Sequence, residues 1–475
     1  MTNALAGVVF VPMAALFAVI LLPSRYSRAV AIAGLLLWPI FLIPLTAMVR
    51  AEGAVTLALG NWPVPLGIGW RVDGLTVVTL WLNAAVALAG TVRAAGFFDP
   101  ERHGARTYWP LWLLLVTATN AALVSADLFN LYVGLELITL VSVALIATAD
   151  NVPALRAAMR YLLLGMLGSL FYLLGVGMVY GQTGSLALAV PAGGAALDST
   201  ALVLMLTGLM VKAAVFPLHV WLPDSYGQAP GPVGALLAAV AGKVALVALW
   251  RIWFLFAPDD TALPWLIGAL GSAAVVYGSL AAMVQTRLKR VVAYSSVAQV
   301  GFLLMVVPLA SPAAFQGAGF HLLVHGFAKA AMFLAAANIL IALGTDAVGR
   351  LSGLDKRMPL EAFTLALAGV TLVGLPPTGG FIGKWKLLEV AWQQAGWAWL
   401  ITILLSGLLS AAYVFRILAM TCFHPRHSGS RAVPRKPPLA ASLAALLLAL
   451  CGVVIGMFPG PVLRLLALAA PGGVS

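Results

Sequence analysis

The sequence is poor in charge and in cysteine. Only 9% of its 475 residues are charged, and its two cysteines are Cys422 and Cys451. Two cysteines with few ligands nearby in sequence cannot build a disulfide framework, a metal cage or an iron–sulfur cluster. The chain also lacks a glycine-rich loop of the kind that cradles phosphate groups. We therefore expect no cofactor and no metal site in this chain, and redox energy, if it is used, would come from a partner.

Long polar stretches are missing as well. The longest polar connections, 96–107, 344–360 and 421–437, have ordinary loop lengths and leave no room for a soluble domain. Hydrophobic residues make up 62% of the chain, which is more than a soluble protein of this size can bury. The composition predicts an all-α polytopic membrane protein consisting of a single membrane domain, residues 1–475.

Apolar segments long enough to cross a bilayer recur along the whole chain. Because a spanning helix needs ~20 residues, we predict fourteen spans, at residues 4–22, 29–49, 72–95, 108–125, 127–148, 158–181, 200–221, 230–256, 264–285, 290–310, 313–343, 361–382, 396–420 and 438–460. The first is a spanning helix rather than a signal peptide, because no basic residue precedes it and Arg25 follows it.

The net charge of +12 is unevenly distributed between alternate connections. Eighteen basic residues, including Arg93 and Lys289, fall in the odd-numbered connections, whereas the even-numbered ones and the chain ends hold four: Arg50, Arg71, Arg251 and Arg464. Basic residues concentrate in cytoplasmic loops. This rule places the odd connections in the cytoplasm and both termini outside. The basic excess therefore indicates topology, and no nucleic-acid partner is expected.

Five charged residues lie inside the apolar spans: Glu136, Lys212, Lys243, Lys329 and Lys384. A charge at membrane depth costs roughly 2.5–3.5 kcal/mol on insertion scales, so it persists only where it is paired, hydrated or used. Desolvation in general lowers the pKa of lysine and raises that of glutamate, which makes such groups able to exchange protons near neutral pH. The pattern indicates a proton path through a membrane.

Proline interrupts two of the spans. Pro217 follows Lys212 by five residues, and the pair Pro376 and Pro377 precedes Lys384. Proline removes a helical hydrogen bond, and such breaks are tolerated at membrane depth when they are buried or line a wet cavity. Paired breaks in two halves of a chain often mark an ion path. Each of these breaks lies beside a lysine, although a kink that only shapes helix packing is the alternative interpretation.

One span carries three ionisable residues at intervals of four, His321, His325 and Lys329. At 3.6 residues per turn they form one stripe along a helix. Histidine titrates near neutral pH and can pass a proton from one ring nitrogen to the other. The spacing favours a proton relay. A two-histidine metal site is the alternative, but no acidic or cysteine ligand lies nearby in sequence.

Glu136 and Lys212 both lie near the middle of their spans. An ion pair would keep both residues charged, and separating them would favour release of the lysine proton. A static salt bridge that only orders the helices remains open as the alternative.

These features together resemble the antiporter-like membrane subunits shared by Mrp-type cation/proton antiporters, respiratory complex I and membrane-bound hydrogenases. The resemblance covers essentially the whole chain and looks closest to the D-type subunit of Mrp antiporters. It is carried by the His321/His325/Lys329 stripe and by four motifs: DLFNLYVGLE (127–136), KAAVFPLHVWLPDSYGQAP (212–230), KRVVAYSSVAQVG (289–301) and GLPPTGGFIGK (374–384).

The resemblance implies a role for each buried charge. Glu136 and Lys212 would form a charge pair, Lys243 would be the central relay lysine, and Lys384 would end the relay toward the exit. His321, His325 and Lys329 would carry the proton between them. The implied fold has fourteen helices with two inverted five-helix repeats, at about 108–256 and 264–420.

Three functions compete. The favoured one is a proton-translocating subunit of a Na+ or K+/proton antiporter, a secondary transporter rather than an enzyme, in a bacterial cell membrane with other membrane subunits as partners. The second is a proton-pumping module of a redox-driven complex. The third is a structural or assembly subunit whose charges only hold helices together. Lysine and histidine side chains can carry protons, whereas a sodium site needs oxygen ligands.

Overall fold

The computed structural model describes residues 2–62, 67–96, 103–189, 197–257, 262–423 and 436–471. Of the basic residues in the charge count, Arg102, Arg426, Arg431 and Arg435 lie outside these ranges, and the side chain of Arg106 is not described.

Helices account for nearly all regular structure in these ranges. The first half contains α1 (Thr2–Leu21), α2 (Ser24–Leu37), η1 (Trp38–Phe41), α3 (Leu42–Glu52), β1 (Val55–Ala58), η2 (Leu59–Asn61), β2 (Gly69–Val72), α4 (Gly74–Ala95), α5 (His103–Val124), α6 (Leu128–Ala147), α7 (Val152–Thr183), α8 (Ser199–Lys212), α9 (Leu222–Gln228), α10 (Gly231–Leu236), η3 (Leu237–Ala241) and α11 (Gly242–Phe256). The second half contains α12 (Leu263–Val284), α13 (Leu288–Leu303), α14 (Val306–Leu309), α15 (Pro312–Leu343), η4 (Val348–Arg350), α16 (Leu354–Arg357), α17 (Pro359–Val373), α18 (Gly379–Gln393), α19 (Trp397–Leu418), η5 (Ala419–Phe423), α20 (Leu439–Met457) and α21 (Gly460–Leu468).

Twelve helices of the described chain are long and apolar enough to cross a membrane, by length and composition. The predicted class, an all-α polytopic membrane protein, is confirmed. The number fourteen stays a prediction, because two of the predicted spans fall on interrupted segments. The predicted span 200–221 ends at Lys212 with α8, and the predicted span 361–382 is split at Val373 between α17 and α18.

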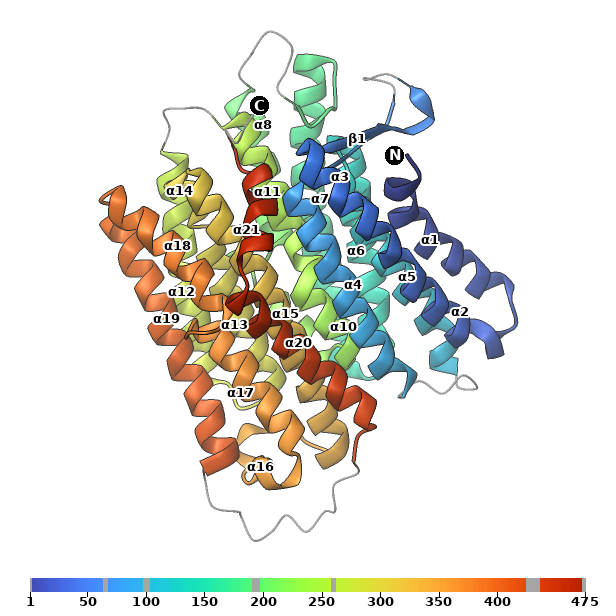
Figure 1. Ribbon diagram of the computed structural model, residues 1–475, viewed down its shortest axis with the longest axis vertical. Coiled ribbons are helices and arrows are strands. Elements are labelled where there is room, and N and C mark those ends of the chain that lie inside the picture. The colour runs from blue at the N-terminus through green and yellow to red at the C-terminus, as the bar shows by residue number, and fades with distance from the viewer. Residues whose placement is uncertain are drawn as a thin grey trace.

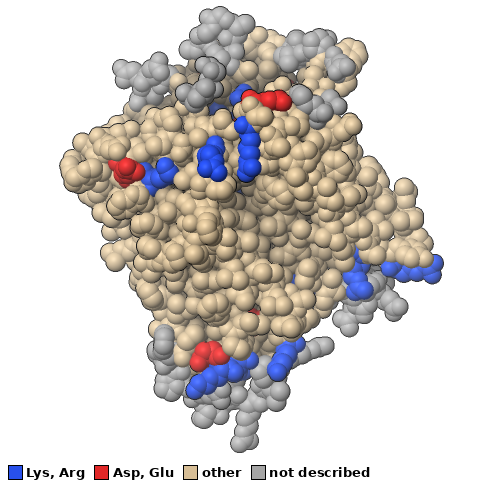
Figure 2. Space-filling view, in the orientation of Figure 1, with Lys and Arg blue, Asp and Glu red and all other residues tan. Residues whose placement is uncertain are grey.

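The helices run largely along the long axis of the molecule, and the N- and C-terminal ends lie at the same end of it (Figure 1). On the face shown in Figure 2, charged side chains gather toward the two ends and leave a broad, nearly uncharged belt between them. A bilayer core requires such a belt, because exposed charge there is costly. The helix α15 lies at the centre and packs against α4, α10, α13, α17, α18, α20 and α21.

Two 32-residue helices, α7 and α15, are built alike. Each begins after a polar N-cap, Asn151 or Ser311, whose side-chain oxygen accepts a backbone N–H of the first turn. Each ends at a glycine with a left-handed backbone, Gly184 (φ 66°) or Gly344 (φ 69°). Glycine adopts this conformation without the steric cost that a side chain would add.

Many features of the first half recur 160 residues later. An antiparallel bridge joins Asp127 to Ala187, and another joins Arg287 to Ala347. The helices α5 and α12 begin at His103 and Leu263 and end at Val124 and Val284. The proline breaks recur at the same interval, at Pro217 and at Pro377.

The small hairpin of β1 and β2 was not predicted from the sequence. The strands pair antiparallel, with Val55 opposite Val72 and Ala58 opposite Gly69. They lie close to the N-terminal end of the chain in Figure 1. The hairpin leads directly into α4, whose N-cap is Asp73.

Candidate functional site: a chain of buried basic groups

The first break places a charge pair between two helices. Lys212 is the last residue of α8, and its Nζ lies 3.3 Å from Oε2 of Glu136 on α6. The same ammonium donates to Oγ1 of Thr139 at 3.0 Å. Ser169 on α7 donates its hydroxyl to Oε2 of Glu136. The two charges that the sequence suggested as a pair are therefore in contact, and three helices supply their partners.

The second break places Lys384 against freed carbonyl groups. The helix α17 stops at Val373, and Gly374 turns the chain with φ 86° before α18 begins at Gly379. The last carbonyls of a helix have no partner within it. Lys384 Nζ donates to the carbonyl oxygens of Leu372 and Val373, each at 3.0 Å. The ammonium of α18 thus satisfies the end of α17.

Lys243 lies next to another irregularity, the π-helical turn η3. A π turn leaves carbonyl groups without their usual helical partner. Lys243 Nζ donates to the carbonyl oxygens of Ala238 and Ala239, at 2.5 and 2.8 Å. Its side chain is buried, and no ion pair with a described acidic residue is found for it.

The three ionisable residues of α15 are all buried. Lys329 Nζ donates to the carbonyl of Val292 at 2.8 Å and to the hydroxyl of Ser295. The rings of His321 and His325 are nearly parallel, with centroids 6.0 Å apart. Neither ring nitrogen of His325 has a hydrogen-bond partner among the described residues. Polar groups buried in this way usually have a partner such as water. A neutral imidazole offers one donor and one acceptor to such a partner.

A polar side-chain network that the sequence analysis missed fixes the other histidine. His321 Nε2 lies 2.8 Å from Oε1 of Gln299, whose amide donates to Oγ of Ser410 at 3.0 Å. Tyr413 donates to the same Ser410 oxygen at 3.1 Å. Gln299 belongs to the 289–301 motif quoted above, but an uncharged residue in an apolar span carries no sequence signal of its partner.

The basic groups form one electrostatic series in the centre of the molecule. His325 is within electrostatic reach of Lys243, Lys329, His321 and Lys384. Lys212 and Lys243 share no hydrogen-bond partner, because their ammonium groups donate to different helices. The structure therefore brings five of the predicted residues together. Among the described residues, the hydrogen bonds of Lys212 go to α6 and not to these five.

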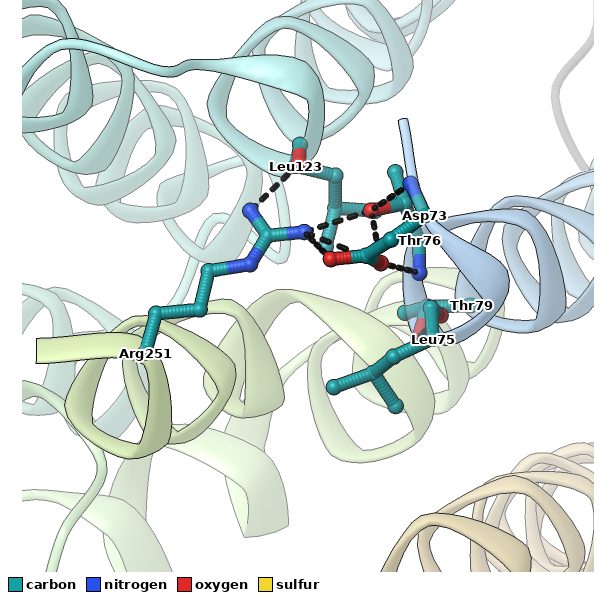
Figure 3. A network of polar contacts seen from close by, with 6 residues as sticks. All are labelled: Asp73, Leu75, Thr76, Thr79, Leu123 and Arg251. Atoms are coloured by element: carbon teal, nitrogen blue, oxygen red, sulfur yellow. Dashed lines mark hydrogen bonds and ion pairs between the residues drawn. The ribbon is translucent and has the colours of Figure 1, made fainter. Parts of the chain in front are cut away.

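The structure corrects the placement of three basic residues that were counted as loop charges. Arg93 and Lys289 are buried within α4 and α13, and Lys289 Nζ donates to the carbonyl of Ala229 at 2.7 Å. Arg251 lies in α11 and donates to the carbonyl of Leu123 at 2.9 Å, to Thr76 and to the carboxylate of Asp73 (Figure 3).

The Asp73–Arg251 contact ties the N-terminal end of α4 to the helix that carries Lys243 (Figure 3). Asp73 also accepts the backbone N–H of Thr76 at 2.8 Å, as an N-cap does. Burial raises the pKa of Asp73, but Arg251 and the Thr76 hydrogen bonds lower it by more. The net pKa therefore lies below the usual value of 3.8.

Glu361 is a second residue that sequence reasoning missed. It is buried in the first turn of α17, where Asn338 donates to its Oε1 at 3.2 Å. Acidic residues are common in first turns of helices because they favour the positive end of the helix dipole. The position therefore looked ordinary in the sequence. In the described ranges, no three His, Cys, Asp or Glu side chains gather as metal ligands.

Comparisons with known proteins show which family the chain belongs to. Residues 125–410 match the family model of NADH:quinone oxidoreductase/Mrp antiporter transmembrane subunits. The N-type subunit of the NADH-quinone oxidoreductase of Desulforudis audaxviator is 34% identical over 88% of this chain and 90% of its own. The D-type subunit of the Na+/H+ antiporter of Bacillus subtilis is 30% identical, over 78% and 77%.

A solved structure, that of the Mrp complex from Dietzia sp. DQ12-45-1b, contains a similar chain. It superposes with a TM-score of 0.89 at 25% identity and covers 100% of this chain and 98% of that one. The family match spans more than half of the residues and includes the five mid-span charges Glu136, Lys212, Lys243, Lys329 and Lys384. The chain therefore belongs to the family of NADH:quinone oxidoreductase/Mrp antiporter transmembrane subunits.

Proposed function

We propose that the chain is a proton-translocating subunit of a multisubunit cation/proton antiporter, in which proton uptake drives export of Na+ or K+. The observation that carries the proposal is the set of buried ammonium groups of Lys243, Lys329 and Lys384, whose hydrogen bonds go only to neutral oxygens. Burial without a counter-ion disfavours the charged form of an amine. Such groups can release a proton and take it up again.

The order of the groups suggests the path. The Glu136–Lys212 pair would act as the switch, because the pairing state of Lys212 changes the field at the neighbouring lysines. Lys243 would be the central relay, His325 with His321 and Lys329 would pass the proton across α15, and Lys384 would deliver it at the second break. The breaks at Pro217 and at Pro376 and Pro377 would provide the carbonyl groups and the room for water that transfer requires.

Residues 108–256 and 264–420 would be two inverted five-helix repeats. The recurrence of breaks, bridges and helix starts at intervals of 160 residues supports this proposal. If each unit crosses the membrane five times, an odd number, the second unit starts on the side opposite to the first. The site would then lie where two oppositely oriented units meet, as in inverted-repeat transporters.

The proposed location is a bacterial cell membrane with both termini on the outer side. The excess of basic residues in alternate connections supports this orientation. Other membrane subunits would be the partners, since the relatives from Bacillus subtilis and Desulforudis audaxviator are named as subunits of larger complexes.

A redox-driven proton pump is the second candidate. The identity of 34% to a subunit of NADH-quinone oxidoreductase favours it. The buried residues would work in the same way, and a partner subunit would supply the redox energy. A structural or assembly role is the third candidate. It predicts that replacing Lys243 reduces only the abundance of the complex.

The deciding experiment measures cation-dependent proton movement in inverted vesicles that contain the assembled complex. Wild type is compared with Lys243→Ala at equal complex abundance, and Lys386→Ala on α18 is the matched control. Loss of the Na+- or K+-dependent pH change in Lys243→Ala alone supports antiport through Lys243. Unchanged transport in that variant contradicts the relay. No cation response in wild type favours the redox-driven pump.

A further inference from the structure

Five helices contribute buried polar side chains to one cluster, which is separate from the lysine series. These residues are Arg93 of α4, Tyr108 of α5, Asn338 of α15, Glu361 of α17 and Ser442 of α20. Glu361 is the acceptor at the centre: Asn338 donates its amide and Ser442 its hydroxyl to the same oxygen, Oε1. Arg93 lies within electrostatic reach of both Glu361 and Tyr108.

The cluster contains an unsatisfied group. Asn338 is fully buried, and its Oδ1 has no hydrogen-bond partner among the described residues. A buried amide oxygen of this kind is costly unless it accepts a hydrogen bond. Because the amide nitrogen already donates to Glu361, the free oxygen is a place for a water molecule beside the carboxylate.

A cavity of about 250 Å³ connects the carboxylate to the surface. Glu361 and Ser442 lie on its wall together with Arg357 and Lys436. Lys436 and Leu439 on its wall are exposed, whereas Glu361 is only 4% exposed. At ~30 Å³ per water molecule, the cavity has room for several. Glu361 is therefore buried in the protein but faces a site that water can fill.

The interface of α17 with α20 leads from this carboxylate toward Lys384. Buried Thr364 and Thr371 follow Glu361 along α17. Thr371 lies against Gly452, where a Cβ would come within 3.4 Å of the threonine hydroxyl. The next residue, Leu372, offers its carbonyl to Lys384. Ten residues separate Glu361 from Thr371, about 15 Å along a helix. Water molecules would have to bridge the gaps between hydroxyl groups.

We infer that Glu361 is a proton-loading carboxylate, which takes up protons that Lys384 releases along the α17–α20 interface and passes them to water in the cavity between Arg357 and Lys436. In the transfer, the ammonium of Lys384 gives up a proton through bridging water, and a carboxylate oxygen of Glu361 accepts it. Glu361 then gives the proton to a cavity water and becomes a carboxylate again. The inference rests on the proposed proton translocation and adds an exit on the proposed cytoplasmic side for the second half of the chain.

The alternative for the same residues is a static ion pair. Arg93 on α4 and Glu361 on α17 would then only hold two helices together. A static pair predicts loss of complex abundance on mutation and no change in pH dependence. Proton loading predicts altered transport at unchanged abundance, because protonation of Glu361 is a step of the cycle. The charged and titratable groups around Glu361 are Arg93, Tyr108, Arg357 and Lys436, which stay in place in a Glu361→Gln variant.

The test combines transport with direct titration. Glu361→Gln is compared with wild type and with the exposed Glu389→Gln as the matched control, in vesicles of equal complex abundance. We expect at least a tenfold slower proton movement in Glu361→Gln, and partial recovery with a displaced pH profile in Glu361→Asp. Infrared titration of the purified complex should contain a carboxylic acid signal that Glu361→Gln removes and Glu389→Gln keeps.

Each outcome decides one proposal. If wild type moves protons and Glu361→Gln does so equally with the same pH profile, proton loading is wrong and the proposed function stands. If wild type shows no cation response, the infrared signal still decides whether Glu361 titrates, and its absence overturns the inference. Should Glu361→Gln fail to assemble, Ser442→Ala and Asn338→Leu remove the hydrogen bonds singly. Unchanged pH profiles in both variants would overturn the inference.

Discussion

Lys212 and Glu136 are in contact, with Nζ and Oε2 3.3 Å apart, but their side chains are buried to different extents. The lysine side chain is 5% exposed and the glutamate side chain is 19% exposed. The more accessible partner is therefore the carboxylate.

Breaking the pair should cost stability that the double variant recovers in part. Removing one partner of a buried pair costs about 3–5 kcal/mol, and the partial exposure of Glu136 reduces this to about 1–3 kcal/mol. We expect Lys212→Met to lower the thermal stability of the complex, and Lys212→Met combined with Glu136→Gln to lose less than the sum of the single variants. Strictly additive losses would show that the two groups do not interact.

Replacing Lys243 should separate stability from transport. Its ammonium is buried with only two backbone carbonyls as acceptors, so a methionine of similar length removes a desolvated charge. We expect Lys243→Met to leave complex abundance equal to wild type or higher and to slow proton movement by at least about tenfold. Lys386→Met serves as the control. A loss of abundance that fully accounts for the lost transport would contradict the relay role.

Gln299 should set the pH dependence through His321. Its Oε1 lies 2.8 Å from the ring nitrogen Nε2 and therefore selects which nitrogen of His321 carries the proton. Gln299→Leu removes this partner, whereas Gln299→Glu keeps an acceptor in place. We expect a displaced pH profile of transport and a several-fold slower rate in the leucine variant, with smaller changes in the glutamate variant. Identical profiles in all three proteins would rule out this positioning role.

Asp73 should make the complex sensitive to acid. The pKa of Asp73 in the folded protein is lower than the usual 3.8. Its ionised form therefore stabilises the folded protein at pH values above 3.8. This contribution is lost as the pH falls below 3.8 toward the folded pKa. Asparagine is also a good N-cap, so Asp73→Asn keeps the cap and removes the charge that faces Arg251. We expect thermal stability to drop in Asp73→Asn at neutral pH and the two proteins to converge in acid.

Asp127 provides a matched test, because its pKa is raised whereas that of Asp73 is lowered. It is the N-cap of α6, accepts the backbone N–H of Asn130 at 2.7 Å, and has its pKa raised by burial. A raised folded pKa means that the ionised form subtracts stability at neutral pH, a loss that disappears as the pH falls through the folded pKa. Asp127→Asn should therefore leave neutral-pH stability unchanged or raise it. A loss as large as that of Asp73→Asn would contradict the assignment to burial.

The membrane class and the five charges inside the apolar spans could be predicted from the sequence, because charge inside an apolar segment stands out. The helix breaks could be predicted too, since proline lacks a backbone N–H and so removes a hydrogen bond from the interior of a helix. The π turn beside Lys243 could not, because its residues, LAAVA, suit an ordinary α-helix equally well. Partners such as Gln299 and Asn338 also escaped prediction, since an uncharged polar residue in a span has many possible neighbours.

Charges near helix ends were the least predictable. Arg93 and Arg251 are close to the ends of their helices and therefore looked like loop residues in a count of charge. Their burial depends on acceptors from distant parts of the chain, such as Asp73 for Arg251. Sequence spacing contains no information on such contacts. The roles of Glu136, Lys212, Lys243, His321, His325, Lys329 and Lys384 in proton transfer stay predictions until transport is measured.

The π turn η3 also gives α11 a way to move. A π turn holds about one residue more than an α turn, so its conversion into a regular turn shifts the following helix by one residue. One residue corresponds to about 100° of rotation and 1.5 Å of travel along the axis. Lys243 comes two residues after the turn, and such a shift would swing its ammonium away from Ala238 and Ala239. Because Arg251 on the same helix contacts Asp73 and Thr76, such a shift of the central lysine would also move the contact between α11 and α4.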